Sequence, residues 1–195
     1  MEVLEAVRKK RFVLGSQSPR RQNMFAQLGL NYIIRPMPID ESFDSSLKAD
    51  EIPMYLAQQK AVPQLDLLQS DDILVTADTV VWINDHALNK PEDLYEARAM
   101  LKEISGAVHE VYTGVCLTSP NAQHTFAEGT EVHFNELADI EIEYYLDRFA
   151  PLDKAGAYGI QEFIGYIGIQ KVVGDFYNVV GFPVQRFWRE IEKIL

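Results

Sequence analysis

The sequence has little cysteine, and Cys116 is the only one among 195 residues. A single thiol excludes an intramolecular disulfide and a zinc cluster built on cysteines, and it fits the reducing cytoplasm. Long apolar runs are also missing. Basic residues crowd the start, from Met1 to Arg11, but no apolar stretch long enough for a signal peptide or a membrane span follows them. We therefore expect a cytoplasmic protein with no membrane partner.

Basic residues are outnumbered, since 18 Lys and Arg face 29 Asp and Glu and give a net charge of −11. Such an excess of negative charge disfavours binding to nucleic acid or to an anionic membrane, so we expect no nucleic-acid partner. A hydrophobic content of 47% in 195 residues can fill a sizeable core. We expect a single domain over residues 1–195, with residues 1–10 as an N-terminal extension.

Strand and helix patterns follow one another along the chain and predict a mixed α and β fold. Strands are expected at Arg11 to Gly15, Tyr32 to Arg35, Ile73 to Ile83, Val108 to Thr118 and Thr125 to Phe134. Helices are expected from Ser18-Pro19 to near Gly29, from about Pro53 with a disturbance at Pro63, from Pro91 to Ser105-Gly106, over Ile142 to Phe149, and from Val184 to Leu195. A polar loop over residues 36–50 separates the second strand from the second helix.

The segment Gly15 to Arg21 reads Gly-Ser-Gln-Ser-Pro-Arg-Arg and lies between the first strand and the first helix. Free backbone N–H groups and the macrodipole at a helix start favour anions, and guanidinium groups contact phosphoryl oxygens bidentately. Ser16, Arg20 and Arg21 are therefore candidate phosphate contacts. The alternative is an ordinary capped helix with solvated arginines, which a lone motif of this kind favours. The sequence contains no Walker motif.

Asp78 interrupts an otherwise hydrophobic strand, Ile73 to Ile83. A buried carboxylate without a partner is costly, so Asp78 should meet a metal, a cation or a hydrogen-bonding network. A purely structural aspartate that accepts backbone hydrogen bonds is an equally open interpretation.

Lys60, Lys90 and Lys154 each stand beside a turn or helix signal, and each alone is typical of a surface lysine. Together with the arginine pair they could form a positive pocket suited to a polyphosphate. Glu41, on the polar loop, could join Asp78 and substrate phosphates in an oxygen site for Mg²⁺ or Mn²⁺, although a solvated loop acid is commoner. The four histidines show no zinc spacing, and no serine-hydrolase elbow is present.

Taken in order, these segments resemble the Maf family of nucleotide pyrophosphatases over Arg11 to the C-terminus. The motifs that carry the resemblance are Ser16 to Arg21, Asp40-Glu41, Leu56 to Ala61, Ala77 to Val81, Asn89-Lys90-Pro91 and Asp153 to Gln161, the last reading Asp-Lys-Ala-Gly-Ala-Tyr-Gly-Ile-Gln. One such motif alone is weak, whereas six in order with family-like spacing are specific.

The resemblance implies a mixed, twisted β-sheet flanked by helices, with two lobes around a deep cleft, of the Maf and inosine triphosphatase type. It also implies a homodimer and metal-dependent cleavage of a nucleoside triphosphate between its α and β phosphates. By the same resemblance Asp78 is the catalytic carboxylate and, with Glu41, a metal ligand. The implied substrate contacts are Ser16, Arg20, Lys60, Lys90 and Gln161. Gln161 and its motif look like those of the branch that acts on dTTP and UTP.

Glu162 departs from the family pattern, which usually has glycine after the glutamine, and Gly15 and Gln17 also differ from the common choices. A larger, charged residue at position 162 is expected to reshape the base pocket. Two rival functions remain open at this stage. One is a nucleotide-binding regulator of cell division that does not hydrolyse its ligand, and the other is an NTPase that releases orthophosphate, which the missing Walker motif disfavours.

Overall fold

A seven-stranded mixed sheet organises the computed structural model, which describes residues 2–195. Met1, the first residue of the expected domain, lies outside the described residues. The strands are β1 Arg11–Leu14, β2 Tyr32–Ile34, β3 Asp72–Ile83, β4 His86–Leu88, β5 Val108–Thr118, β6 Gln123–Phe134 and β7 Ile169–Val173. Their order is β2-β1-β3-β5-β6-β7, with β4 paired to β3. β1 runs parallel to β2 and β3, and the other pairs are antiparallel. The mixed sheet expected from the sequence is confirmed.

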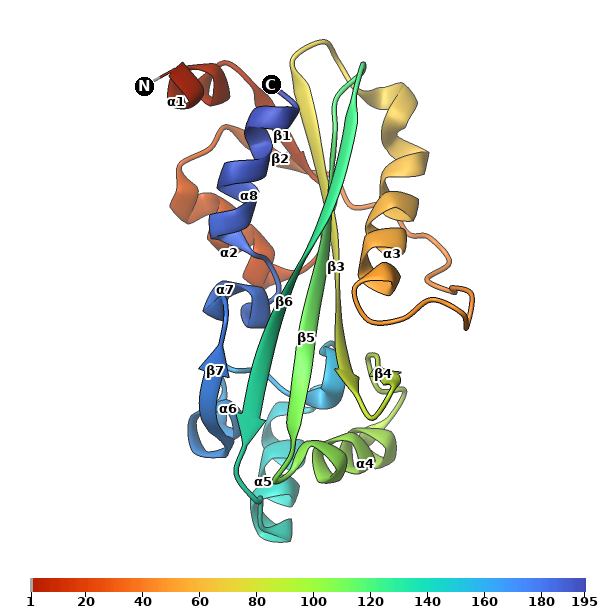
Figure 1. Ribbon diagram of the computed structural model, residues 1–195, viewed down its shortest axis with the longest axis vertical. Helices are drawn as coiled ribbons and strands as arrows, with labels where there is room; N and C mark the ends of the chain where they lie inside the picture. Colours follow the sequence, from red (N-terminus) through yellow and green to blue (C-terminus); the bar gives the residue numbers. More distant parts are fainter. Residues whose placement is uncertain (1) are drawn as a thin grey trace.

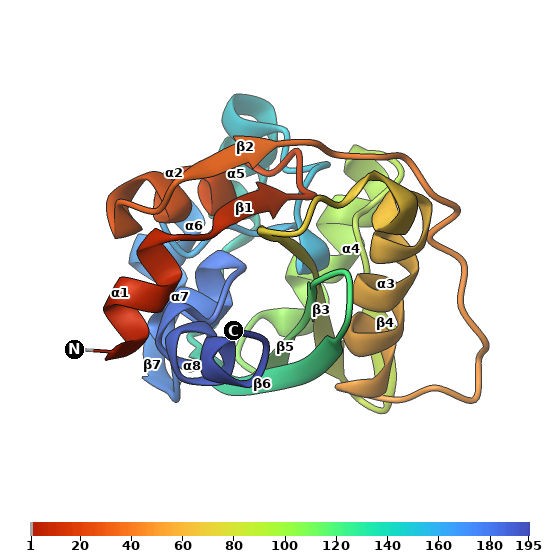
Figure 2. The same cartoon turned by 90° about the horizontal axis from the view of Figure 1, so that it is seen from above.

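Helices cover both sides of the long strands β3, β5 and β6, which run along the molecule (Figures 1 and 2). The α-helices are α1 Glu2–Arg8, α2 Pro19–Leu28, α3 Glu51–Ala61, α4 Leu94–Ile104, α5 Asp139–Phe149, α6 Phe163–Gly168, α7 Phe176–Val180 and α8 Val184–Glu190. Short 3₁₀ turns follow at η1 Val62–Leu67, η2 Ala155–Ala157 and η3 Ile191–Lys193. Across residues 2–195, none of these helices combines the length and the hydropathy that a bilayer crossing needs.

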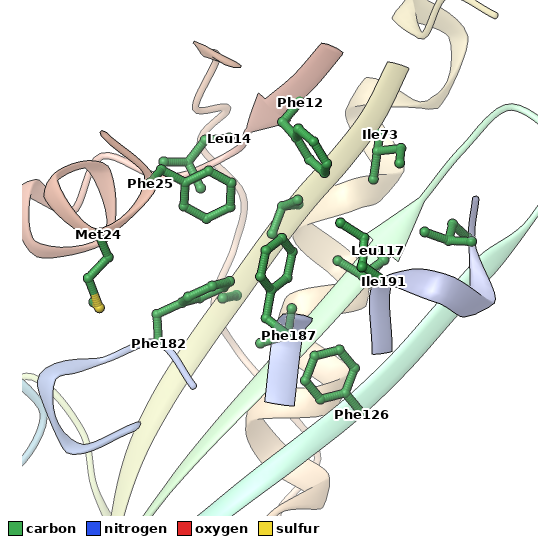
Figure 3. Close-up of a cluster of buried hydrophobic side chains, with 14 of the residues drawn as sticks. Phe12, Leu14, Met24, Phe25, Ile73, Leu117, Phe126, Phe182, Phe187 and Ile191 are labelled. Carbon is green, nitrogen blue, oxygen red and sulfur yellow. The ribbon is translucent and has the colours of Figure 1, made fainter. Parts of the chain in front are cut away.

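Two hydrophobic clusters form the two lobes that the family resemblance implies. The first packs α2 and α8 against β1 and the start of β3, and its aromatic centre includes Phe12, Phe25 and Phe187 (Figure 3). The second gathers α4 and α5 around the other ends of β3 and β5. Ala77 belongs to the first cluster and Val81 to the second. β3 therefore passes from one lobe to the other at the position of Asp78.

α3 lies on the side of the sheet opposite the first hydrophobic cluster, and alternate residues of β3 face this helix. Leu74 packs in a third, small cluster with Ala57 of α3, and Thr76 Oγ1 donates to the Ala57 carbonyl oxygen at 2.6 Å. The helix comes close to β5 at Gly114, where an added Cβ would lie 2.2 Å from the carbonyl carbon of Pro53. This close approach fixes α3 on the sheet and brings its last turn beside Asp78.

Several boundaries differ from the expectation. The second helix begins at Glu51, and Pro63 lies in a 3₁₀ turn that follows it, because proline cannot continue the α-helical hydrogen bonds. The C-terminal helix stops at Glu190 and ends in a 3₁₀ turn. The expected N-terminal extension contains α1, and Val7, with 1% exposure, is part of the first core cluster. Four short elements, β4, β7, α6 and α7, are additions, because segments this short show no periodicity.

Candidate functional site

A cleft of about 720 Å³ opens between the two lobes. It is bordered by the loop before α2, the loop after β2, the end of α3, the middle of β3, Lys90 after β4, and two later segments, 153–162 and 179–181. Every residue proposed from the sequence lies on its wall: Ser16, Arg20, Arg21, Glu41, Lys60, Asp78, Lys90 and Gln161. The fold thus brings together side chains from six separate parts of the chain.

The loop before α2 has the geometry of an anion site. Ser18 caps the helix, its Oγ accepting the Arg21 backbone N–H at 3.5 Å, and Pro19 occupies the first turn. Ser16 Oγ accepts the backbone N–H of Ser18 at 3.2 Å, which curls the loop over the helix end. Arg20 borders the cleft and pairs with Asp153 at 3.2 Å. A helix N-terminus with a nearby guanidinium suits phosphate oxygens.

The guanidinium group of Arg21 donates its hydrogen bonds to other protein groups in the cleft wall. Its Nε donates to the Gly181 carbonyl oxygen at 2.8 Å, one terminal nitrogen to the Ala77 carbonyl oxygen at 2.9 Å, and the other to Thr79 Oγ1 at 3.0 Å. Burial lowers the pKa of the Arg21 guanidinium, and the charge of Asp78 opposes that effect. Arg21 thus bridges the residues immediately before and after Asp78.

Asp78 and Glu41 share one lysine. Lys60 Nζ lies 2.5 Å from Asp78 Oδ1 and 2.9 Å from Glu41 Oε1, and Lys90 Nζ lies 3.3 Å from Glu41 Oε2. Partial burial raises the pKa of Glu41, but the hydrogen bond and charge of Lys60, with those of Lys90, more than offset it, so the net pKa is lowered. Glu41 is therefore a carboxylate at neutral pH. Two negative and two positive side chains meet at this point of the cleft.

The same pair of carboxylates is the place to test for a divalent metal. Within residues 2–195 no three or more His, Cys, Asp and Glu side chains gather as a ready-made metal site. Asp78 and Glu41 nevertheless both contact the same cationic nitrogen, Lys60 Nζ. Mg²⁺ usually takes one or two protein carboxylates and completes its shell with waters and substrate phosphates. The donor set fits such an ion, with the remaining ligands coming from the substrate.

Gln161 borders the cleft on a segment with unusual backbone geometry. Gly156 and Ala157 both have positive φ, 66° and 56°. A side chain at 156 would also place its Cβ 2.9 Å from Val81 Cγ2, so glycine is required there. The following Tyr158 is held by His109, whose Nε2 is 2.8 Å from the phenol oxygen. This wall presents Gln161 to the cleft.

Two charged residues on the cleft wall have a larger part than the sequence assigned to them. Lys154, named only as one of three lysines near turn signals, is 8% exposed, and its Nζ lies 2.6 Å from Asp153 Oδ1 and 3.2 Å from Glu162 Oε1. The signal that could have pointed to this ion cluster is Glu162, the departure from the family pattern. Tyr145, the hydrogen-bond partner of Glu162, could not be found from the sequence. It belongs to the apolar stripe of a helix, and that pattern gives no sign of what its hydroxyl group contacts.

Comparisons with known proteins identify the family of the chain. A family profile described as Maf-like protein matches residues 11–194. A protein of Phocaeicola vulgatus named dTTP/UTP pyrophosphatase is 45% identical over 98% of this chain and 100% of its own length. A Bacteroides thetaiotaomicron protein of the same name is 43% identical over 95% of this chain and 97% of its own. Among solved structures, the Staphylococcus aureus Ham1 protein covers 95% of this chain and is itself covered completely, with a TM-score of 0.53 at 12% identity. That likeness confirms the fold class.

Proposed function

The chain belongs to the Maf family, and because of this membership and the geometry of the cleft we propose that it hydrolyses dTTP and UTP to the monophosphate and pyrophosphate. The observation that carries the proposal is Asp78 at the junction of the lobes, with Lys60 Nζ 2.5 Å away and the phosphate-type loop on the same cleft. A carboxylate poised beside cations that can hold a polyphosphate is what the reaction needs.

The substrate binds with its phosphates at one end of the cleft and its base at the other. Ser16 and Arg20 contact the phosphates from the start of α2, Lys60 from the last turn of α3, and Lys90 from the loop after β4. Gln161 contacts the base, since its amide can both donate and accept a hydrogen bond, as the edge of uracil or thymine requires. The presence of Ser16, Arg20, Lys60, Lys90 and Gln161 on the wall of one cleft supports this arrangement.

Asp78 acts as the general base. Lys60 holds Oδ1 and so orients the carboxylate, and Oδ2 takes a proton from a water molecule as the water oxygen attacks the α-phosphorus. The bond from the α-phosphorus to the oxygen that bridges to the β-phosphorus breaks, and pyrophosphate leaves with that oxygen. Lys60 and Lys90 balance the negative charge that grows on the leaving group.

Asp78 and Glu41 would hold Mg²⁺ or Mn²⁺ together with phosphate oxygens. When bound, such a cation draws charge from the phosphates and lowers their repulsion toward the attacking oxygen. The ionised state of Glu41 at neutral pH supports its role as a ligand.

We propose that the protein works in the cytoplasm as a homodimer and removes unwanted pyrimidine triphosphates before polymerases use them. The lone buried thiol of Cys116 supports a reducing compartment. The dimer and the cellular role rest on the resemblance to the family, since fold alone does not fix them.

The test is an assay of the purified protein with Mg²⁺ or Mn²⁺ against dTTP, UTP, CTP, ATP, GTP and 7-methyl-GTP, with the products identified. We expect pyrophosphate and the monophosphate from dTTP and UTP. Orthophosphate as the product would contradict the proposal and point to an ordinary NTPase. Tight binding without turnover of any triphosphate would support a regulator instead.

A further inference from the structure

Glu162 folds back over the segment that carries Gln161. It follows Gln161 in the sequence and borders the same cleft. Its side chain covers Gly159 so closely that an added Cβ on that glycine would lie 2.8 Å from Glu162 Cδ. The side chain is 25% exposed, so most of it lies against the protein and away from water.

One oxygen of Glu162 faces a buried cation. Lys154 Nζ lies 3.2 Å from Glu162 Oε1 and 2.6 Å from Asp153 Oδ1, and its side chain is 9% exposed. A buried ammonium group needs charged or polar partners in place of water. Asp153 also accepts from Arg20, so a chain of ion pairs links the base end of the cleft to the phosphate loop.

The other oxygen of Glu162 accepts a hydrogen bond from the phenol of Tyr145, a fully buried residue of α5. The same phenol oxygen accepts the backbone N–H of Gly159 at 3.2 Å. Burial, together with the Glu162 carboxylate, raises the pKa of Tyr145, so the phenol remains a donor at neutral pH. Glu162 thereby ties the segment to α5 as well as to Lys154.

From these contacts we infer that Glu162 is a positioning residue that fixes the base end of the cleft. It holds Lys154 and Tyr145 at once, and so sets the conformation of residues 158–161 and the direction of the Gln161 side chain. A glycine at this position would leave Lys154 with one carboxylate and Tyr145 without its acceptor. The inference rests on the proposed function and gives Glu162 a role in base discrimination.

The test compares Glu162→Gly and Glu162→Gln with the wild type in kcat and KM for dTTP, UTP and CTP. We expect Glu162→Gly to raise KM for dTTP and UTP about tenfold, the scale set by a lost charge-assisted hydrogen bond, with kcat within about twofold. The preference for UTP over CTP should shrink in parallel. Glu162→Gln keeps an acceptor for Tyr145 and loses only the charge, so its KM should fall between the two.

A matched control is Glu143→Gln, on the same helix as Tyr145, where Glu143 pairs with Arg98 at the surface. Its KM values should equal those of the wild type. A second readout needs no activity: hydrogen exchange of the segment 154–162 should be faster in Glu162→Gly, because the Gly159 N–H loses a held acceptor.

The outcomes separate the two proposals. Wild-type hydrolysis of dTTP and UTP, with unchanged KM values in both Glu162 variants, overturns the inference and leaves the function standing. A lower melting temperature with unchanged KM values overturns it equally, because Glu162 would then be only structural. A wild type that hydrolyses no triphosphate overturns the proposed function, and unchanged hydrogen exchange in Glu162→Gly would then also overturn the positioning role.

Discussion

Two adjacent arginines at the start of α2 have different surroundings. Arg20 borders the cleft and pairs with the exposed Asp153, so it can turn toward a ligand. Arg21 uses its guanidinium on Ala77, Thr79 and Gly181, which flank or face the strand at Asp78. The sequence presents both as phosphate contacts, and only the contacts made by the folded chain separate their environments.

Arg21→Lys should lower both stability and turnover. A lysine ammonium cannot reproduce the planar fork, so at least one carbonyl beside Asp78 loses its donor. We expect kcat for dTTP to fall about tenfold and the free energy of unfolding by about 2 kcal/mol. Steady-state kinetics and urea unfolding measure the two effects. Arg20→Lys is the control, and we expect it to raise KM without a change in unfolding. A stable, fully active Arg21→Lys protein would show that the contacts of Arg21 with Ala77, Thr79 and Gly181 are not needed for stability or turnover.

Asp78→Asn should give a folded protein that is nearly inactive. The amide cannot take a proton from water, and loss of a positioned base typically costs about 10²–10⁴-fold in rate. An assay of product formation from dTTP tests this. Circular dichroism checks that the variant is folded. Asp85→Asn, in the exposed turn after β3, should keep wild-type turnover. Turnover in Asp78→Asn equal to the wild type would remove Asp78 from the mechanism.

At the scale of elements, the position of α3 decides where Lys60 lies. The helix rests on β5 at Gly114, where a Cβ would meet the backbone of Pro53 and Met54 at 2.2 and 2.3 Å. Backbone atoms cannot turn aside as a side chain can, so any larger residue must displace the whole helix. The glycine is therefore a structural requirement for the position of Lys60.

Gly114→Ala should destabilise the protein by about 3 kcal/mol, since an overpacked contact forces the backbone to shift. Because α3 carries Lys60, kcat should fall as well. Urea unfolding and the dTTP assay measure both. Gly129→Ala is the control in the neighbouring strand β6, where the added Cβ would meet a movable atom, Tyr112 Cε1 at 2.7 Å. Equal losses in the two variants would be evidence against a rigid contact between α3 and the sheet.

The pairing of β1 with β3 contains an ion pair between the partly exposed Arg11 and the buried Asp72. Arg11 donates two hydrogen bonds to Asp72, at 2.7 and 2.9 Å. Burial raises the pKa of Asp72. The hydrogen bonds from Arg11 and from the Gln69 N–H, together with the charge of Arg11, lower the pKa by more than burial raises it, so the net pKa is below the ordinary 3.8. The pair therefore stabilises the fold fully above pH 3.8, and its contribution is lost as the pH falls through the folded-state pKa.

Asp72→Asn should cost about 2 kcal/mol at pH 7, the scale of a charge-assisted hydrogen bond. The difference from wild type should stay constant down to about pH 5 and shrink below about pH 4, because the wild type then loses its own ion pair. Urea unfolding over this pH range measures it. Asp71→Asn, next in sequence but exposed, should match the wild type throughout. A difference that grows toward low pH would refute the assignment.

At the scale of the whole molecule, the cleft lies between two hydrophobic clusters, so a ligand in it contacts both lobes. A non-hydrolysable dUTP analogue with Mn²⁺, at about 100 times its dissociation constant, should stabilise the fold by about 2.7 kcal/mol. For a chain of this size that corresponds to a rise of about 5–10 °C in Tm. Calorimetry measures it, with deoxyuridine and Mn²⁺ as the control. Equal Tm values with the analogue and with deoxyuridine would argue against phosphate binding between the lobes.

The amino-acid sequence alone predicts the long elements and the family, and it names residues that the fold then places on one cleft wall. Apolar residues that recur at the period of a strand or a helix predict β3, β5 and α4, because one side of each element packs against the core along its length. The ordered motifs predict the residues on the cleft wall. A charge within the hydrophobic strand predicts that Asp78 has a partner, since a lone buried carboxylate is too costly.

Which of these residues contact one another follows from the packing of the folded chain. Lys60 is 18 residues from Asp78, Glu162 is 17 from Tyr145, and Arg21 is 160 from Gly181. The direction of a side chain depends on how helices and strands from distant parts of the chain pack, and local sequence holds no record of that packing. The short elements β4, β7, α6 and α7 have the same origin, because contacts with the sheet and the core, more than intrinsic propensity, stabilise segments of a few residues.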